Sequence, residues 1–216
     1  AAQKLITIDK VYYILGGVCP QEVSDGERVA QNAQVVWISP ATPTVGETYS
    51  EEIVDYTFHT SPALTLAATV AARHAISALG KTAVVISENT EQAQALRNEF
   101  SKSFIESGGK IVFDETYAHD ATNFKTLGTK IKSTKADFMY IAVYTPQPAV
   151  ALIKQLRDQK TSIKILTNET LFTEDVVVQN KQILEGVVGV REYTELVSLE
   201  AKTFAEKYQK IQEAFT

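Results

Sequence analysis

Thr82-Ala83-Val84-Val85-Ile86-Ser87 is the stretch of sequence that decides the fold. It is a short, continuous apolar run, which is typical of a strand buried on both faces of a parallel sheet. The segment before it has helical periodicity, with one apolar stripe made up of Ala68, Ala71, Ala72, Ala75, Ile76 and Leu79. We expect a helix over residues 62–79, capped by Ser61, with Pro62 at its first position and Gly80 at its end.

The pairing of a helix with a strand repeats along the chain. A helix carries Leu96, Phe100 and Phe104, and further helices are predicted at residues 123–132, from Pro146 onward, as a short turn after Thr173, and at residues 198–215. Strands are predicted at residues 12–15, 35–38, 111–113, 137–143, 163–166 and 186–190. This alternation predicts an α/β fold with parallel sheets flanked by helices.

Composition limits the classes of protein to consider. The chain has 216 residues, 44% of them hydrophobic, which is enough for two lobes of about 100 residues each. No apolar run reaches the roughly 18 residues of a membrane helix, and the N-terminus lacks the layout of a signal peptide, so we expect a cytosolic chain or a mature, trimmed one. A net charge of −5 without a basic cluster argues against nucleic acid as a partner. Both ends read as cut within helices.

Motifs for catalysis and for cofactor or metal binding do not emerge. Gly80-Lys81-Thr82 imitates the end of a phosphate-binding loop but has Ala75 where a glycine is required. Gly16-Gly17 lacks the third glycine of a dinucleotide fingerprint, and the three histidines have no metal-ligand spacing. Cys19, the only cysteine, cannot form an internal disulfide; its position at a strand end favours a small buried residue over a reactive thiol. We predict a protein that is not an enzyme and that uses no cofactor and no metal.

Two loops at the ends of predicted strands are candidate binding sites. Ser39-Pro40-Ala41-Thr42-Pro43-Thr44 can aim hydroxyl and peptide N–H groups at a carboxylate, although an ordinary turn has the same composition. Glu169 follows the strand at 163–166 beside hydroxyls, where it could meet a ligand ammonium group or cap the next helix. Ligands of parallel sheets gather at this edge, so function is sought there.

An ordered set of short motifs carries a resemblance to a known family. The set comprises Gly16-Gly17-Val18-Cys19, Ile38-Ser39-Pro40-Ala41-Thr42, Phe58-His59-Thr60-Ser61-Pro62, Tyr140-Ile141-Ala142-Val143-Tyr144-Thr145-Pro146, Asn168-Glu169-Thr170 and Leu184-Glu185-Gly186-Val187-Val188. In this order and spacing the chain resembles the type I periplasmic binding proteins of the leucine/isoleucine/valine-binding group. These proteins are extracytoplasmic solute receptors of ABC transporters.

The resemblance implies a two-lobed architecture. Residues 1–60 and 193–216 would form lobe 1, which is expected to be incomplete, and residues 61–192 would form lobe 2, with crossovers near residues 58–62 and 191–194. Ligand would lie in the cleft between the lobes. The resemblance also implies a periplasmic or extracytoplasmic location, with the signal peptide absent from this chain, and the membrane subunits of an ABC transporter as partners. An incomplete lobe could self-associate.

The resemblance also assigns roles at the site. The loop after Ser39 would hold an α-carboxylate through Ala41 and through Thr42 or Thr44, Tyr144 would line the cleft, and Glu169 would receive an α-ammonium group.

Three departures from the family pattern bear on these roles. Pro20 stands where the family usually has serine, so Gln21 is a substitute donor, and Gln92 replaces a tyrosine of the pocket wall. The cysteine that pairs with the Cys19 position in the family has no counterpart here. A branched aliphatic ligand is therefore not the expected one.

The leading hypothesis from the sequence is a solute-binding protein. It would bind a small polar or amino-acid-like molecule and close its lobes around it for delivery to an ABC transporter. The alternatives are a cytosolic ligand-sensing regulator of the same fold and, third, an α/β enzyme.

Overall fold

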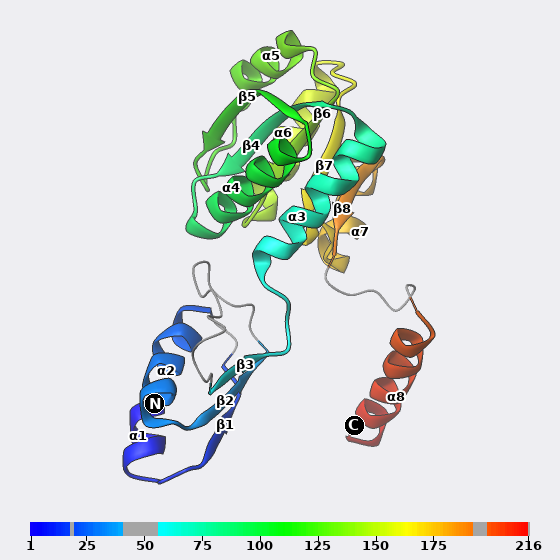
Figure 1. Ribbon diagram of the computed structural model, residues 1–216. Coiled ribbons are helices and arrows are strands. Elements are labelled where there is room, and N and C mark those ends of the chain that lie inside the picture. The colour runs from blue at the N-terminus through cyan, green and yellow to red at the C-terminus, as the bar shows by residue number, and fades with distance from the viewer. Residues whose placement is uncertain (18–19, 41–55, 192–197, 216) are drawn as a thin grey trace.

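The computed structural model describes residues 1–17, 20–40, 56–191 and 198–215, and its strands form two parallel sheets (Figure 1). The smaller sheet has three strands in the order β1-β2-β3, and the larger has five in the order β5-β4-β6-β7-β8. The chain leaves β3 and passes directly into the helix that opens the larger unit. Within the described part of the chain, no helix combines the length and apolar character needed to cross a bilayer.

The smaller unit consists of short strands and of helices of unequal length. They are α1 (Ala2–Thr7), β1 (Tyr13–Leu15), α2 (Pro20–Ala33), β2 (Val36–Ser39) and β3 (Thr57–His59). The indole of Trp37 lies over Gly26 of α2, where an added Cβ would come within 2.5 Å of the ring. Its Nε1–H donates to the carbonyl of Gly16 at 3.0 Å, so one side chain joins the sheet, the helix and the end of β1.

The larger unit alternates strands and helices throughout. Its first half consists of α3 (Leu64–His74), a π-helical turn η1 (Ala75–Leu79), β4 (Thr82–Glu88), α4 (Glu91–Glu106), β5 (Lys110–Tyr117) and α5 (Lys125–Thr134). The second half consists of β6 (Phe138–Ala142), α6 (Pro146–Asp158), β7 (Lys164–Asn168), the short 3-10 turn η2 (Glu169–Phe172), α7 (Glu174–Leu184) and β8 (Val187–Val190). A last helix, α8 (Leu199–Phe215), follows.

Helices cover both faces of the five-stranded sheet. On one face, α3 and α4 contribute an aromatic core in which Phe100 stacks on Tyr140 with ring centroids 3.8 Å apart. On the other face, α5, α6 and α7 pack through apolar side chains such as Ile131, Leu152 and Val176. Residues 83–88 of β4 are buried without interruption, which confirms the prediction of a strand covered on both faces.

The predicted order of helices and strands is confirmed, with differences at particular ends. The first helix of the larger unit begins at Leu64 and not at Pro62, because its N-cap is Ala63. The hydroxyl of Ser61, predicted to cap it, donates instead to the carbonyl of Pro40 at 2.8 Å. Gly80 does end the helical segment, since its N–H donates to Ala75 at 3.0 Å and its φ of 146° suits glycine.

Two elements of the smaller unit were not predicted. Residues 57–59 form strand β3, within the run that the sequence indicated as a turn-like crossover. Pro20 begins the 14-residue helix α2, so Gln21 lies in its first turn and not in an open loop.

In the larger unit, the helix predicted as a short turn after Thr173 is the 11-residue α7.

Candidate functional site

The strand order of the larger sheet locates a natural binding position. β4 is the first strand of this sheet in the sequence, and the chain adds β5 on one side of it before adding β6, β7 and β8 on the other. The two halves of the sheet therefore diverge between β4 and β6. Ligands of parallel sheets bind outside the carboxyl ends of the strands at such a point, because the loops there separate. Glu88 ends β4 and Tyr144 follows β6, so these residues flank this position.

Glu88 is a fully buried carboxylate that accepts three hydrogen bonds from the segment after β6. Its Oε2 accepts from the backbone N–H of Tyr144 at 3.0 Å and of Thr145 at 2.6 Å, and its Oε1 accepts from the Thr145 hydroxyl at 2.8 Å. Thr145 is the N-cap of α6, so the charge lies at the positive end of that helix. The negative charge is thereby compensated without a cationic side chain.

Tyr117 lies beside Glu88 in the sheet, where the two residues pair in register. Its side chain is buried, and burial together with the negative charge of Glu88 raises the pKa of its hydroxyl above the ordinary value of a tyrosine. The phenol is therefore neutral over the whole physiological pH range.

Asn168, at the end of β7, holds the segment between β6 and α6 from the side opposite to Glu88. Its Oδ1 accepts from the N–H of Val143 at 2.8 Å, and its Nδ2 donates to the Val143 carbonyl at 2.8 Å and to the Thr170 hydroxyl at 2.8 Å. Thr170 in turn donates to the Val143 carbonyl at 3.2 Å. The turn before α6 is therefore fixed by buried polar groups from β4 and from β7.

The predicted site residues of this edge lie on the neighbouring loops. Tyr144 is 56% exposed, and Glu169 is exposed as the first residue of η2. Because both sequence neighbours of Glu169 bond to Val143, the structure brings the Tyr144 and Glu169 loops side by side. Gln92, half-buried in the first turn of α4, follows β4 at the same edge.

The smaller sheet has its own carboxyl edge, at Ser39 and His59. The hydroxyl of Ser39 is buried and donates to the carbonyl of Gly17 at 3.0 Å, which joins the ends of β1 and β2. Nε2 of His59 lies 3.0 Å from Oε1 of Glu27 on α2, and both side chains are almost completely buried. Ser39 and His59 pair in register, so this edge is held by short-range polar contacts.

Part of the predicted carboxylate loop lies outside the described residues. This holds for Ala41, Thr42 and Thr44, and also for Cys19. Gln21 lies in the first turn of α2. The predicted ligand contacts of Gln21, Ser39, Gln92, Tyr144 and Glu169 stay predictions.

Sequence reasoning missed four polar residues that shape these edges: Glu27, His59, Glu88 and Asn168. The sequence carried a signal for two of them, since Glu88 and Asn168 end apolar strands, each directly after another buried polar residue, Ser87 and Thr167. Their partners are 56 or 57 and 25 positions away, so the bonds themselves could not be inferred from local spacing.

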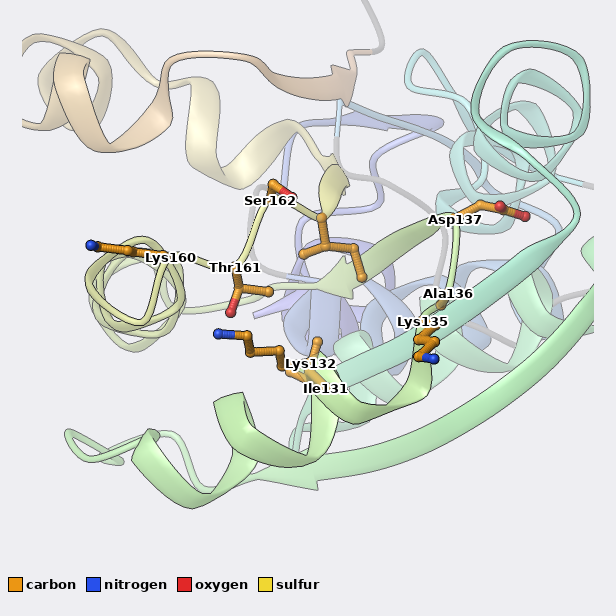
Figure 2. A pocket seen from close by; sticks show the side chains of 9 residues that line it. Ile131, Lys132, Lys135, Ala136, Asp137, Lys160, Thr161 and Ser162 are labelled. Atoms are coloured by element: carbon orange, nitrogen blue, oxygen red, sulfur yellow. The ribbon is translucent and has the colours of Figure 1, made fainter.

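A hollow of about 200 Å³ lies at the opposite, amino edge of the larger sheet. Three lysines contribute to its wall, and two of them, Lys135 and Lys160, follow the carboxyl ends of α5 and α6 in left-handed backbone conformations (Figure 2). The ammonium group of Lys132 donates to the Gln159 carbonyl at 3.2 Å, and Figure 2 shows Lys160 extending away from the other lining residues. These cations complement helix carboxyl ends, and the hollow is below the size of typical ligand pockets.

Metal binding finds no support in the described ranges, where no group of three or more His, Cys, Asp or Glu side chains could hold an ion.

Comparison with known proteins gives one family and a consistent fold. The family model described as "Periplasmic binding protein" matches residues 1–214. A curated relative from Pseudomonas aeruginosa, described as an amino acid binding protein, is 22% identical over 190 residues, which cover 87% of this chain and 50% of that protein.

Solved structures of solute receptors share the fold. The leucine binding protein LivK of Thermotoga maritima superposes with a TM-score of 0.74 at 22% identity, covering 97% of this chain and 59% of that one. An R. palustris solute-binding protein of an ABC transporter, in complex with 4-hydroxybenzoate, gives a TM-score of 0.69 at 22% identity, covering 97% and 57%.

The chain thus spans between half and three fifths of the length of these proteins. The match to the family extends over both sheets and over α8, and it agrees with the parallel sheets, the flanking helices and the divergent loops described above. The chain belongs to the periplasmic binding protein family.

Proposed function

We propose that this chain is part of the solute receptor of an ABC transporter and binds a small molecule that carries an ammonium and a carboxylate group. The observation that carries the proposal is the pair of exposed side chains, Tyr144 and Glu169, on adjoining loops at the carboxyl edge of the larger sheet. Both loops are held by buried polar groups, which is typical of a preorganised binding surface.

The two side chains suit the two halves of such a ligand. The Glu169 carboxylate would accept charge-assisted hydrogen bonds from the ammonium group, and the Tyr144 ring would cover the side chain of the ligand. The loop that begins at Ser39 would supply N–H and hydroxyl donors to the ligand carboxylate. Closure of the two sheets around the ligand would exclude water and strengthen these contacts.

Two ligand classes occur among the similar proteins: one is described as an amino acid binding protein, and another was solved with 4-hydroxybenzoate. Glu169 supports the first class, because a benzoate brings a negative charge to the cleft and no cation to pair with a glutamate. Gln92 adds a polar group, which supports a polar amino-acid side chain over a branched aliphatic one. The proposed location is the periplasm, and the proposed partners are the membrane subunits of the transporter.

A thermal-shift screen of the purified protein tests the proposal. The panel contains the twenty amino acids, 4-hydroxybenzoate and benzoate, and each hit is measured by calorimetry. Because ligand binding raises the melting temperature by mass action, we expect a shift with at least one amino acid. A shift with benzoates alone would contradict the role of Glu169, and no shift with any compound would contradict binding of this class.

A further inference from the structure

We propose that Glu88 is a positioning residue that sets ligand affinity by fixing the backbone of Tyr144 and Thr145. The inference rests on the proposed function, because it assigns a role to a residue that lies behind the binding surface. Glu88 is 0% exposed and so does not reach a ligand itself. All three of its bonds to the turn before α6 end on Tyr144 or Thr145.

The position of Glu88 makes it an effective anchor. Gln94 of α4 donates to the carbonyl of Glu88 at 3.2 Å and to the hydroxyl of Ser87 at 3.1 Å, which fixes the end of β4. The hydrogen bonds of the carboxylate then join the end of β4 to the segment after β6, at the point where the two halves of the sheet diverge. Because the charged acceptor is buried, its bonds are stronger than those of an exposed group.

Positioning of Tyr144 requires that both of its neighbours be held. Asn168 holds Val143 on one side, and Glu88 holds Thr145 and the Tyr144 amide on the other. The side chain of Tyr144 itself remains exposed. A fixed backbone sets the position from which the ring projects, so less backbone entropy is lost when the ring contacts a ligand.

Asp137 provides a matched control within the same sheet. It also accepts from two backbone amides and one threonine hydroxyl, namely Lys81 N at 2.9 Å, Thr82 N at 2.8 Å and Thr82 Oγ1 at 2.7 Å. These bonds lie at the amino edge, away from the binding loops. Asp137→Ala therefore removes three bonds of the same kinds as those of Glu88, and it leaves the turn before α6 unaltered.

The experiment compares Glu88→Ala, Glu88→Gln and Asp137→Ala with the wild-type chain. Hydrogen exchange of the Tyr144 and Thr145 amides is measured without ligand, and calorimetry measures affinity for the amino acid that gives the largest thermal shift in the panel of twenty. We expect Glu88→Ala to speed exchange at both amides and to weaken binding about tenfold or more. Glu88→Gln keeps an acceptor oxygen and should restore slow exchange and most of the affinity, and Asp137→Ala should alter neither reading.

Thr145→Val serves as a milder variant if Glu88→Ala does not fold, because it removes only the hydroxyl bond to Glu88. It should weaken binding of the same amino acid by a smaller factor. Unchanged amide exchange in Glu88→Ala, or faster exchange with wild-type affinity, would overturn the positioning role. Failure of the wild-type chain to bind any compound of the panel would instead overturn the proposed function, and the exchange measurement would still decide whether Glu88 holds the turn.

Discussion

Asn168 forms a two-point contact with the backbone of Val143, accepting from its N–H at 2.8 Å and donating to its carbonyl at 2.8 Å. The side chain takes the place of a further strand residue, because it satisfies both backbone groups just past the end of β6. Asn168 is only 6% exposed, so neither bond is easily replaced by water. The contact joins the loop of Glu169 to the loop of Tyr144.

Asn168→Asp should disrupt this contact while preserving the size of the side chain. The donor that faces the Val143 carbonyl becomes an acceptor, and a charge is buried without a cation. We expect the free energy of unfolding to fall by about 1–3 kcal/mol, and affinity for the amino acid with the largest thermal shift to fall with it. Chemical denaturation and calorimetry measure the two effects.

Asn180→Asp is the matched control for that variant. The amide of Asn180 is half-buried and donates to the carbonyl of Val176 at 2.9 Å, a contact within α7 that does not involve Val143. A loss of affinity in Asn180→Asp as large as that in Asn168→Asp would show that the Val143 contact has no special role.

Glu169→Gln tests the ammonium partner directly. The substitution keeps the shape of the side chain and removes its charge, which leaves a bound ammonium group without its partner. We expect an affinity loss of about 2–5 kcal/mol for an amine-bearing ligand. Glu174→Gln, an exposed glutamate in the first turn of α7, is the control. Equal affinity of Glu169→Gln and the wild-type chain would reject the assignment.

The larger sheet was predictable because its strands and most of its helices carry a strong local pattern, α7 being the exception that the sequence indicated only as a short turn. Residues 83–88 of β4 are continuously buried, and α6 begins at Pro146 with buried Leu152, Ile153 and Leu156 at helical spacing. β3 was not predictable in this way, because it has only three residues and runs straight into Thr60-Ser61-Pro62. A parallel partner strand, rather than its own sequence, makes residues 57–59 extended.

The site was predictable only in part, because part of it depends on contacts between distant segments, as β3 does. Tyr144 and Glu169 follow strands at a sheet edge, which is a feature that local sequence reveals. The groups that hold their loops depend on contacts between segments far apart in the chain, as with Glu88 and Thr145, which are 57 positions apart. Such contacts follow from the strand order, and the strand order is a property of the whole fold.

The buried pair of Glu27 and His59 should stabilise the smaller sheet. Removing one partner from a buried polar pair costs about 1–3 kcal/mol, because the other partner loses that contact out of reach of water. We expect Glu27→Ala to lose stability in this range and Glu27→Leu/His59→Leu to regain much of it.

Trp37 is the only tryptophan and lies in β2, so its fluorescence follows unfolding of this unit. His74→Ala, on the exposed side of α3, should have little effect. Wild-type stability of Glu27→Ala would contradict the prediction.

Asp137 should make stability depend on pH in the acid range. The Thr82 hydroxyl, followed by the backbone N–H groups of Thr82 and Lys81, lowers the pKa of this carboxyl group below its ordinary value. A lowered pKa stabilises the fold fully above the unfolded-state pKa of about 3.9, and the contribution is lost as pH falls through the folded-state pKa. The difference in unfolding free energy between the wild-type chain and Asp137→Asn should therefore be constant above about pH 5 and shrink below about pH 4. Urea titrations across this range measure it, and a constant difference at all pH values would contradict the expectation.

Helix α8 should pack against the open face of the smaller sheet, as expected if residues 193–216 belong with residues 1–60. Both surfaces are apolar and exposed: on the helix they comprise Leu199, Phe204, Tyr208 and Ile211, and on the sheet Tyr13, Leu15, Ile38 and Phe58. An isolated helix of 17 residues is only marginally stable in water, so slow amide exchange in α8 would require packing.

We expect α8 to be protected in the wild-type chain and to lose that protection in Phe58→Ser. Val178→Ser, which changes an exposed apolar residue of α7, should leave α8 protected. Protection that depends on protein concentration would indicate that a second copy supplies the sheet, and fast exchange of α8 at every concentration would show that it does not pack on this face.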